Sequence, residues 1–260
     1  MNARSVWLIA RSVLIEAVRR KEIYTIVFLS TLLIGAVMTL DFFGIDDLNK
    51  FYREVALKVM GVSTALTVIV LSARQLPREF ETRTIYPLLA KPVSRVTFLA
   101  GKLAGVMLAA AFCFGLFMAV YIVGTLWTGG VIPWSLFFQY VFLQMVMLLI
   151  LATLGFWLSM MLNLDAAITF GVIFYASAST LATMSSYLYG FMDTGGRILL
   201  TVMTFIVPQL TLLDLSAKTI HAEAWGPIAW QPMAMLTVYG LIFALIYFAL
   251  ATVWFRRRAL

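Results

Sequence analysis

Residues 74–102 read RQLPREFETRTIYPLLAKPVSRVTFLAGK and form the only long polar segment between two apolar runs. The segment holds six basic residues, two acidic residues and three prolines. Each proline removes an amide donor and restricts the residue before it, so short helical pieces are predicted. Because apolar residues cluster at 85–89, we interpret the segment as an amphipathic helix pair at a membrane surface, with one face for a soluble partner. The alternative is an ordinary basic loop that only fixes topology.

The composition around this segment is that of a membrane protein. Of the 260 residues, 63% are hydrophobic and 12% are charged, and the mean hydropathy is +0.98. A soluble domain of this length could not bury so much apolar surface. We therefore expect an all-α polytopic protein in which residues 1–260 form one transmembrane domain, with no separate soluble domain and no cleavable signal peptide. The single cysteine, Cys113, excludes an internal disulfide and a cysteine metal cluster.

Six apolar runs are long enough to cross a bilayer, which takes about 20 residues each. They cover residues 23–40, 55–73, 103–127, 136–162, 166–192 and 233–255. Before them, residues 4–21 carry apolar and basic side chains on opposite halves of a helix, which predicts an interfacial amphipathic helix. The alternative is a cytosolic extension of the first membrane helix.

The predicted outer loop 193–230 contains a further apolar run. This run, at 198–213, is only 16 residues long and includes Pro208. If it crossed the membrane, the basic C-terminal residues would lie outside, against the usual charge distribution. We therefore expect a re-entrant or interfacial helical segment on the outer side, between the fifth and sixth helices.

The distribution of Lys and Arg predicts the orientation. With the N-terminus in the cytoplasm, the inner segments hold 14 of the 19 basic residues and the outer segments hold 5. Because cytoplasmic loops are enriched in Lys and Arg, both termini and the 74–102 loop should be cytoplasmic. The net charge of +7 is explained by topology and by attraction to anionic lipid. Nucleic-acid binding is disfavoured, since the charges flank membrane spans.

The sequence carries no pattern typical of catalysis. A phosphate-binding G-x-x-x-x-G-K-[ST] is absent, because Val96 stands where its first glycine belongs and Leu103 follows Lys102. The only histidine, His221, has no second His or Cys nearby and is a poor metal ligand. We therefore predict no catalytic residue, no metal site and no cofactor in this chain.

Charged side chains are almost missing from the predicted spans, so no carboxylate relay for a proton-coupled carrier is expected. Gln139 and Gln144, in the fourth span, are the main buried polar candidates. They could line a transport path or join neighbouring helices by hydrogen bonds.

Residues 79–102 contain a recognisable order of motifs. A glutamate (Glu79 or Glu81) is followed by Thr84, Leu88-Leu89, Pro92-Val93-Ser94-Arg95 and Gly101-Lys102. This order resembles the cytoplasmic loop of ABC-2-type exporter permeases, although Arg83 replaces the usual glycine and Pro87 is an added break. A weaker similarity lies at Pro208-Gln209-Leu210 with Asp214. Within the family the chain looks most like the branch for multicopper-enzyme maturation.

The resemblance implies a permease subunit that works as a dimer, either with a second copy or with a homologue. Two separate ATPase subunits would bind ATP and Mg and drive export across the cytoplasmic (inner) membrane of a bacterium or archaeon. The 74–102 loop would be the ATPase-coupling element, and the inner turn at 163–165 a second contact. The residues expected to contact the ATPase are Glu79, Glu81, Thr84, Arg95, Lys102, Asn163 and Asp165.

We expect the substrate path along the second and fifth spans, at the two-fold interface of a dimer. An apolar wall cannot replace the hydration shell of an ion, so an amphipathic, lipid-like or small neutral substrate is predicted. Helix–helix packing is the alternative role for every residue of this path. The path residues are Ser63, Thr64, Thr67, Ser177, Thr180, Met184 and Tyr187.

Two functions from other classes compete with transport. One is an intramembrane lipid-modifying enzyme, which is disfavoured because paired carboxylates, histidine clusters and an activated nucleophile are lacking. The other is a membrane scaffold or sensor. An ATPase in the native complex would separate the permease from both.

Overall fold

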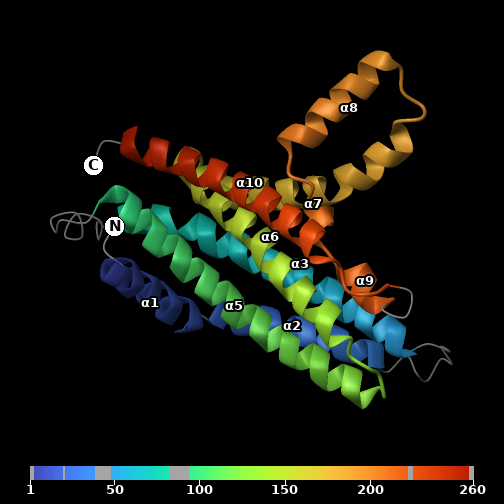
Figure 1. Ribbon diagram of the computed structural model, residues 1–260. Coiled ribbons are helices and arrows are strands. Elements are labelled where there is room, and N and C mark those ends of the chain that lie inside the picture. The colour runs from blue at the N-terminus through green and yellow to red at the C-terminus, as the bar shows by residue number, and fades with distance from the viewer. Residues whose placement is uncertain (1–2, 20, 39–47, 82–93, 222–224, 258–260) are drawn as a thin grey trace.

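Figure 1 shows the computed structural model as a helical bundle, with no strand in the part of the chain that is described. The structure describes residues 3–19, 21–38, 48–81, 94–221 and 225–257. The predicted all-α fold is therefore confirmed. The elements are α1 (Ala3–Arg19), α2 (Lys21–Met38), α3 (Leu48–Glu81), α5 (Arg95–Trp127), α6 (Trp134–Met161), α7 (Leu164–Leu188), α8 (Thr194–Ile206), the short 3₁₀ helix η2 (Leu210–Leu213), α9 (Ser216–Ile220) and α10 (Trp230–Arg257).

Among the described residues, five helices are long and apolar enough to cross a membrane, namely α3, α5, α6, α7 and α10. Of the first predicted span, 23–40, residues 23–38 belong to α2, and the rest lies outside the described residues. Helices α3 and α5 are longer than predicted, with 34 and 33 residues. At about 1.5 Å per residue they exceed the hydrocarbon thickness, so polar turns continue beyond the apolar runs.

The apolar run at 198–213 forms two helical pieces, as its proline suggests. Helix α8 and the segment Leu210–Ile220 are bent by 50° at the break, which contains Pro208. Proline lacks the amide hydrogen that would continue a helix. This geometry is that of a broken span or of a re-entrant loop, and a sixth crossing results if the pair is one span. In Figure 1, α8 and the end of α7 extend away from the bundle.

Helix α6 lies at the centre and packs against α10, α3, α7 and α5. Helix α1 packs along α5, and its buried residues are Ile9, Ala10, Val13 and Ala17. Two glycines of α5 allow this close approach. A Cβ atom at Gly101 would lie 2.8 Å from the Cβ of Ile9, and one at Gly105 would lie 2.5 Å from the Cβ of Val13. The predicted amphipathic helix at 4–21 therefore buries its apolar face against protein.

The last turns of α3 and α10 and the first turn of α5 lie at one end of the bundle (Figure 1). The end of α3 and the start of α5 meet there through Gln75 and Lys102. The end of α10 meets the start of α5 through Arg95. The end of α6 also reaches this region, because Gly155 lies against Ser72 of α3.

Candidate functional site

The exit of the 74–102 loop is anchored to the last turn of α10. Ser94 caps α5, since its Oγ accepts a hydrogen bond from the Thr97 amide at 3.1 Å. Arg95 Nη1 donates to the carbonyl oxygens of Phe255 at 3.1 Å and Arg256 at 3.0 Å. Such carbonyls have no partner inside their own helix, and a cation there also interacts favourably with the helix dipole. The start of α5 is thereby coupled to the end of α10.

Aromatic rings support the same contact. The Arg95 guanidinium lies 5.8 Å from the centroid of the Phe255 ring. The Phe255 ring in turn stacks on Phe98 of α5, with centroids 6.1 Å apart. Cation–π and stacking contacts add to the hydrogen bonds of Arg95. The junction of α5 with α10 therefore has a polar and an apolar part.

Lys102 ties the same part of α5 to α3. Its side chain is only 5% exposed, and its Nζ donates to Oε1 of Gln75 at 3.2 Å. Nζ also lies 5.8 Å from the centroid of the Phe98 ring. The Lys102 ammonium group thus points into the bundle, so in this conformation the residue joins two helices of the same chain.

The other predicted ATPase contacts are described in part. Thr84 lies outside the described residues, and for Glu79 and Glu81 the structure gives the backbone, as the last turn of α3. In the inner turn, Asn163 caps α7 by accepting a hydrogen bond from the Ala166 amide at 3.1 Å. Asp165 is exposed in the first turn of α7, where a negative charge is favourable.

The predicted path residues of α3 lie against other helices of the bundle. Ser63 Oγ pairs with Ser30 Oγ of α2 at 2.8 Å. Thr64 and Thr67 are buried in the bundle and donate to carbonyl oxygens of their own helix. Thr67 also lies beside Cys113 of α5. Ser63 therefore contacts α2, and Thr67 contacts α5.

The predicted path residues of α7 lie on its outer surface. Ser177 and Thr180 are exposed and donate to carbonyl oxygens within the same helix. Met184 and Tyr187 are also exposed. The structure therefore does not bring the two predicted rows of residues together within one protomer.

A cavity of about 610 Å³ lies instead between α3, α6, α7 and η2. Of the predicted path residues, only Thr180 lines it. In its wall, Lys58 Nζ and Asp214 Oδ2 form an ion pair at 2.9 Å. The residues that carry its polar character are Lys58 of α3, Tyr140 and Gln144 of α6, Tyr175, Ser179 and Thr180 of α7, and Thr211 and Asp214 at η2.

Polar side chains hold the 193–230 loop to the bundle. Gln139 forms a reciprocal pair with the backbone of Ile228, because its Nε2 donates to the carbonyl oxygen and its Oε1 accepts from the amide, both at 2.9 Å. Arg53 is buried, and its Nη2 donates to the carbonyl oxygen of Thr219. Sequence reasoning missed this role of Arg53, since it counted the residue only as an outer charge.

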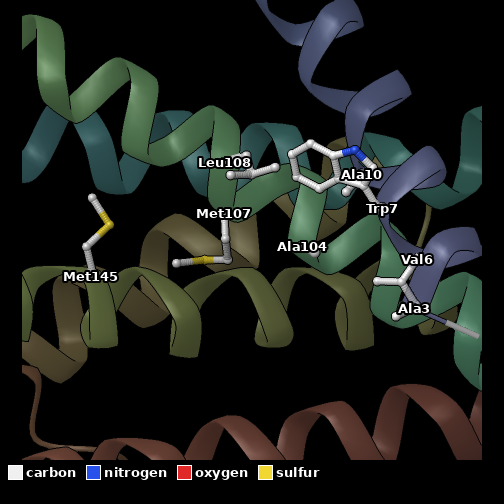
Figure 2. A pocket seen from close by; sticks show the side chains of 8 residues that line it. All are labelled: Ala3, Val6, Trp7, Ala10, Ala104, Met107, Leu108 and Met145. Atoms are coloured by element: carbon white, nitrogen blue, oxygen red, sulfur yellow. The ribbon is translucent and has the colours of Figure 1, made fainter. Parts of the chain in front are cut away.

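An apolar groove of about 600 Å³ runs between α1, α5 and α6. Figure 2 shows the Trp7 ring of α1 beside the α5 segment that carries Leu108, Met107 and Ala104, with Met145 of α6 further along. All of its lining residues are apolar. Apart from the Trp7 indole N–H, their side chains offer no hydrogen-bond donor to a ligand. The polar cavity at η2 is therefore the better candidate for recognising a functional group.

A protein-family model described as "ABC-2 family transporter protein" matches residues 17–179. The chain belongs to this family. The match runs from the end of α1 into α7 and includes the 74–102 loop, the inner turn and most residues of the cavity. A search of curated proteins found no match. This ABC-2 protein is thus a multi-pass membrane protein and the permease component of an ABC transporter.

Proposed function

We propose that this permease exports an amphipathic, lipid-like or small neutral molecule across the cytoplasmic membrane of a bacterium or archaeon. Two separate ATPase subunits would bind ATP and Mg, because this sequence has no phosphate-binding glycine motif. The observation that carries the proposal is the double anchoring of the 74–102 loop exit. Arg95 connects it to α10 and Lys102 connects it to α3.

This anchoring gives a route from an ATPase to the membrane helices. A displacement of the loop by the ATPase would move α3 and α10 together, and α10 packs along the central helix α6. Transport requires such a link, since closure of the ATPase pair must shift the permease between inward-open and outward-open states. Glu79, Glu81 and Thr84 remain the proposed surface contacts, with Asn163 and Asp165 as a second contact. Lys102 would act from inside the bundle.

We also propose that the permease works as a dimer and that the end of the bundle that carries the 74–102 loop lies in the cytoplasm. The partner would be a second copy or a homologous permease, and the large exposed apolar side chains of α7 and α8 would face it or lipid. The start of α5 and the end of α10, which carry basic residues of the predicted inner segments, lie at one end of the bundle, and this supports a cytoplasmic C-terminus (Figure 1). The similarity to the multicopper-enzyme-maturation branch stays a prediction, and the proposed mechanism does not depend on it.

The first test is association with the ATPase. The double substitution Glu79→Lys and Glu81→Lys should weaken co-purification of the ATPase with the permease. Wherever basic residues of the ATPase face these positions, the new lysines would bring like charges together, which costs several kcal/mol at an interface. Asp193→Lys is a matched control, since Asp193 is exposed in the predicted outer loop. Unchanged co-purification and unchanged transport in the double variant would remove these residues from the contact.

The second test addresses transmission through the loop exit. Arg95→Gln removes the charge that bridges α5 to α10 and should lower transport per ATP hydrolysed in reconstituted vesicles. Arg257→Gln, at the exposed end of α10, is the control and should leave this ratio unchanged. Equal transport per ATP hydrolysed in wild type and Arg95→Gln would show that the contact of Arg95 with α10 does not transmit the movement.

A further inference from the structure

We infer that the cavity between α3, α6, α7 and η2 binds an uncharged amphipathic molecule whose carbonyl or ether oxygen accepts a hydrogen bond from Gln144. Its volume of about 610 Å³ lies within the range of about 300–1,000 Å³ found for small-molecule sites. The inference adds a ligand class to the proposed function. Only the role of the ligand as the transported substrate rests on that function.

The Gln144 amide is the group that points to a ligand. The side chain is 1% exposed and lines the cavity. Its Nε2 is buried and has no hydrogen-bond partner among the described residues. A buried donor without an acceptor is costly, and native structures usually satisfy such groups. An acceptor atom inside the cavity would satisfy this one.

The neighbouring glutamine and tyrosine show why Gln144 stands apart. Gln139 uses both its donor and its acceptor on the backbone of Ile228, so it joins two parts of the chain. Tyr140 lies one helical turn before Gln144 and donates its hydroxyl hydrogen to the carbonyl oxygen of Leu57 at 3.3 Å. Both side chains have a structural partner, whereas the Nε2 donor of Gln144 is left for a ligand.

Gly61 of α3 keeps space open beside these polar atoms. A Cβ atom at this position would lie 3.6 Å from Gln144 Nε2 and 3.6 Å from the Tyr140 hydroxyl oxygen. A methyl group would fit at that distance, but a longer side chain would fill the polar part of the cavity. The absence of a side chain at Gly61 thus keeps side-chain atoms of α3 away from the Gln144 amide nitrogen.

The remaining wall determines the charge and polarity of the ligand. Much of it is apolar, with Leu57, Val62 and Leu66 from α3, Met147 from α6, Val172 from α7 and Leu210 from η2. Lys58 and Asp214 are the only charged side chains that line it among the described residues, and they neutralise each other. A ligand with a net charge would lack a counter-charge here. An apolar body with one or two acceptor oxygens fits best.

Benzophenone is a suitable probe, because it is an apolar, uncharged ketone that forms covalent adducts with nearby C–H groups under ultraviolet light. The full-length permease in lipid nanodiscs would be irradiated with benzophenone, and adducts would be located by peptide mass spectrometry. We expect adducts on the cavity-lining segments of α3, α6 and α7. Gln144→Met, which keeps the length of the side chain but removes the donor, should lower this labelling about fivefold to tenfold.

Two glycine variants test the cavity independently of Gln144. Gly61→Leu should abolish labelling of these segments by filling the space. Gly115→Leu on α5 is the matched control and should leave labelling unchanged, since no described atom lies within 4 Å of a Cβ built there. If Gln144→Met does not fold, the comparison of Gly61→Leu with Gly115→Leu still tests whether the cavity binds the probe. Full cavity labelling in folded Gly61→Leu overturns the inference.

A second probe separates hydrogen bonding from packing. Trifluoromethyl-phenyldiazirine is also apolar and uncharged but has no carbonyl or ether oxygen. Its labelling of the cavity should fall in Gly61→Leu and stay unchanged in Gln144→Met. An equal loss of both probes in Gln144→Met would mean that the residue only supports packing, which overturns the assignment. No ATPase is needed, so failure here leaves the association test of the proposed function unaffected.

Discussion

Helices α6 and α8 are both apolar, but they are buried to opposite extents. Helix α6 packs against α3, α5, α7 and α10, and Leu148 at its middle is 0% exposed. Helix α8 is described along its whole length and has no buried residue, and its Leu199 is 59% exposed. An apolar helix outside the bundle must have lipid or another protein around it, because water contact would be unfavourable. Hydrophobicity therefore marks both the core and the surface of this permease.

Helices α6 and α8 differ in their close contacts at small residues and in their hydrogen bonds to other segments, as well as in buried apolar area. Gly155 of α6 lies against Ser72, and a Cβ atom there would be 2.0 Å from the Ser72 Oγ. Gln139 of α6 binds the backbone before α10. Gly195 of α8, by contrast, has no described atom within 4 Å of a built Cβ. Close backbone approach and interhelical hydrogen bonds are what join helices in a membrane.

Leucine truncation should give the largest contrast between the two helices. We expect Leu148→Ala to lower the free energy of unfolding by about 3 kcal/mol, because it leaves a cavity in the core. Leu199→Ala should change it by less than about 0.5 kcal/mol, since the side chain is exposed. Thermal unfolding of both variants in detergent measures the difference. Equal losses would mean that α8 packs as tightly as α6.

Filling glycines should give an intermediate effect. Gly105→Leu would place side-chain atoms against Val13 and the carbonyl oxygen of Ala10, so we expect a cost of about 2 kcal/mol and loosening of α1. Gly195→Leu in α8 meets open space and should be neutral. Protease protection of α1, together with unfolding temperature, reports both effects. An unchanged α1 in Gly105→Leu would contradict the tight contact.

The ion pair between α3 and the 193–230 loop should have the smallest effect. Lys58→Met removes the partner of Asp214, but both side chains are partly exposed, so we expect a loss of only about 0.5 kcal/mol. The difference from wild type should shrink further at high salt, because exposed charges are screened. A comparison of unfolding curves at low and high ionic strength tests this. A salt-independent loss would place the pair in a buried environment.

Much of the fold was contained in the sequence, because its signals are local. Runs of apolar residues predict helices, and Pro208 predicts the break after α8. Ser94 and Asn163 occur at helix starts as capping side chains. The family resemblance rested on motif residues of the 74–102 loop, and the family match includes that loop. These features depend on neighbouring residues, so no tertiary contact is needed to read them.

The positions of the polar side chains within the bundle required the tertiary structure. The sequence placed Ser63, Thr64 and Thr67 along a path, whereas the cavity is lined by a different face of α3 that includes Gly61. It could not separate Gln139, which binds Ile228, from Gln144, which lines the cavity and whose amide nitrogen has no hydrogen-bond partner among the described residues. Nor could it pair residues as distant as Lys58 and Asp214.

The physical reason is the rotation of each helix about its own axis. A helix with one apolar stripe turns that stripe toward the core, so its orientation follows from periodicity. Helix α1 is such a case, and Ala10, Val13 and Ala17 of its predicted apolar half are buried against α5. Helix α6 is apolar on all sides, including the side that carries the exposed Phe138 and Phe142, so its sequence pattern does not predict which side faces the other helices. The sequence therefore determined which segments are helices and where they break, and packing between helices decided which side chains meet.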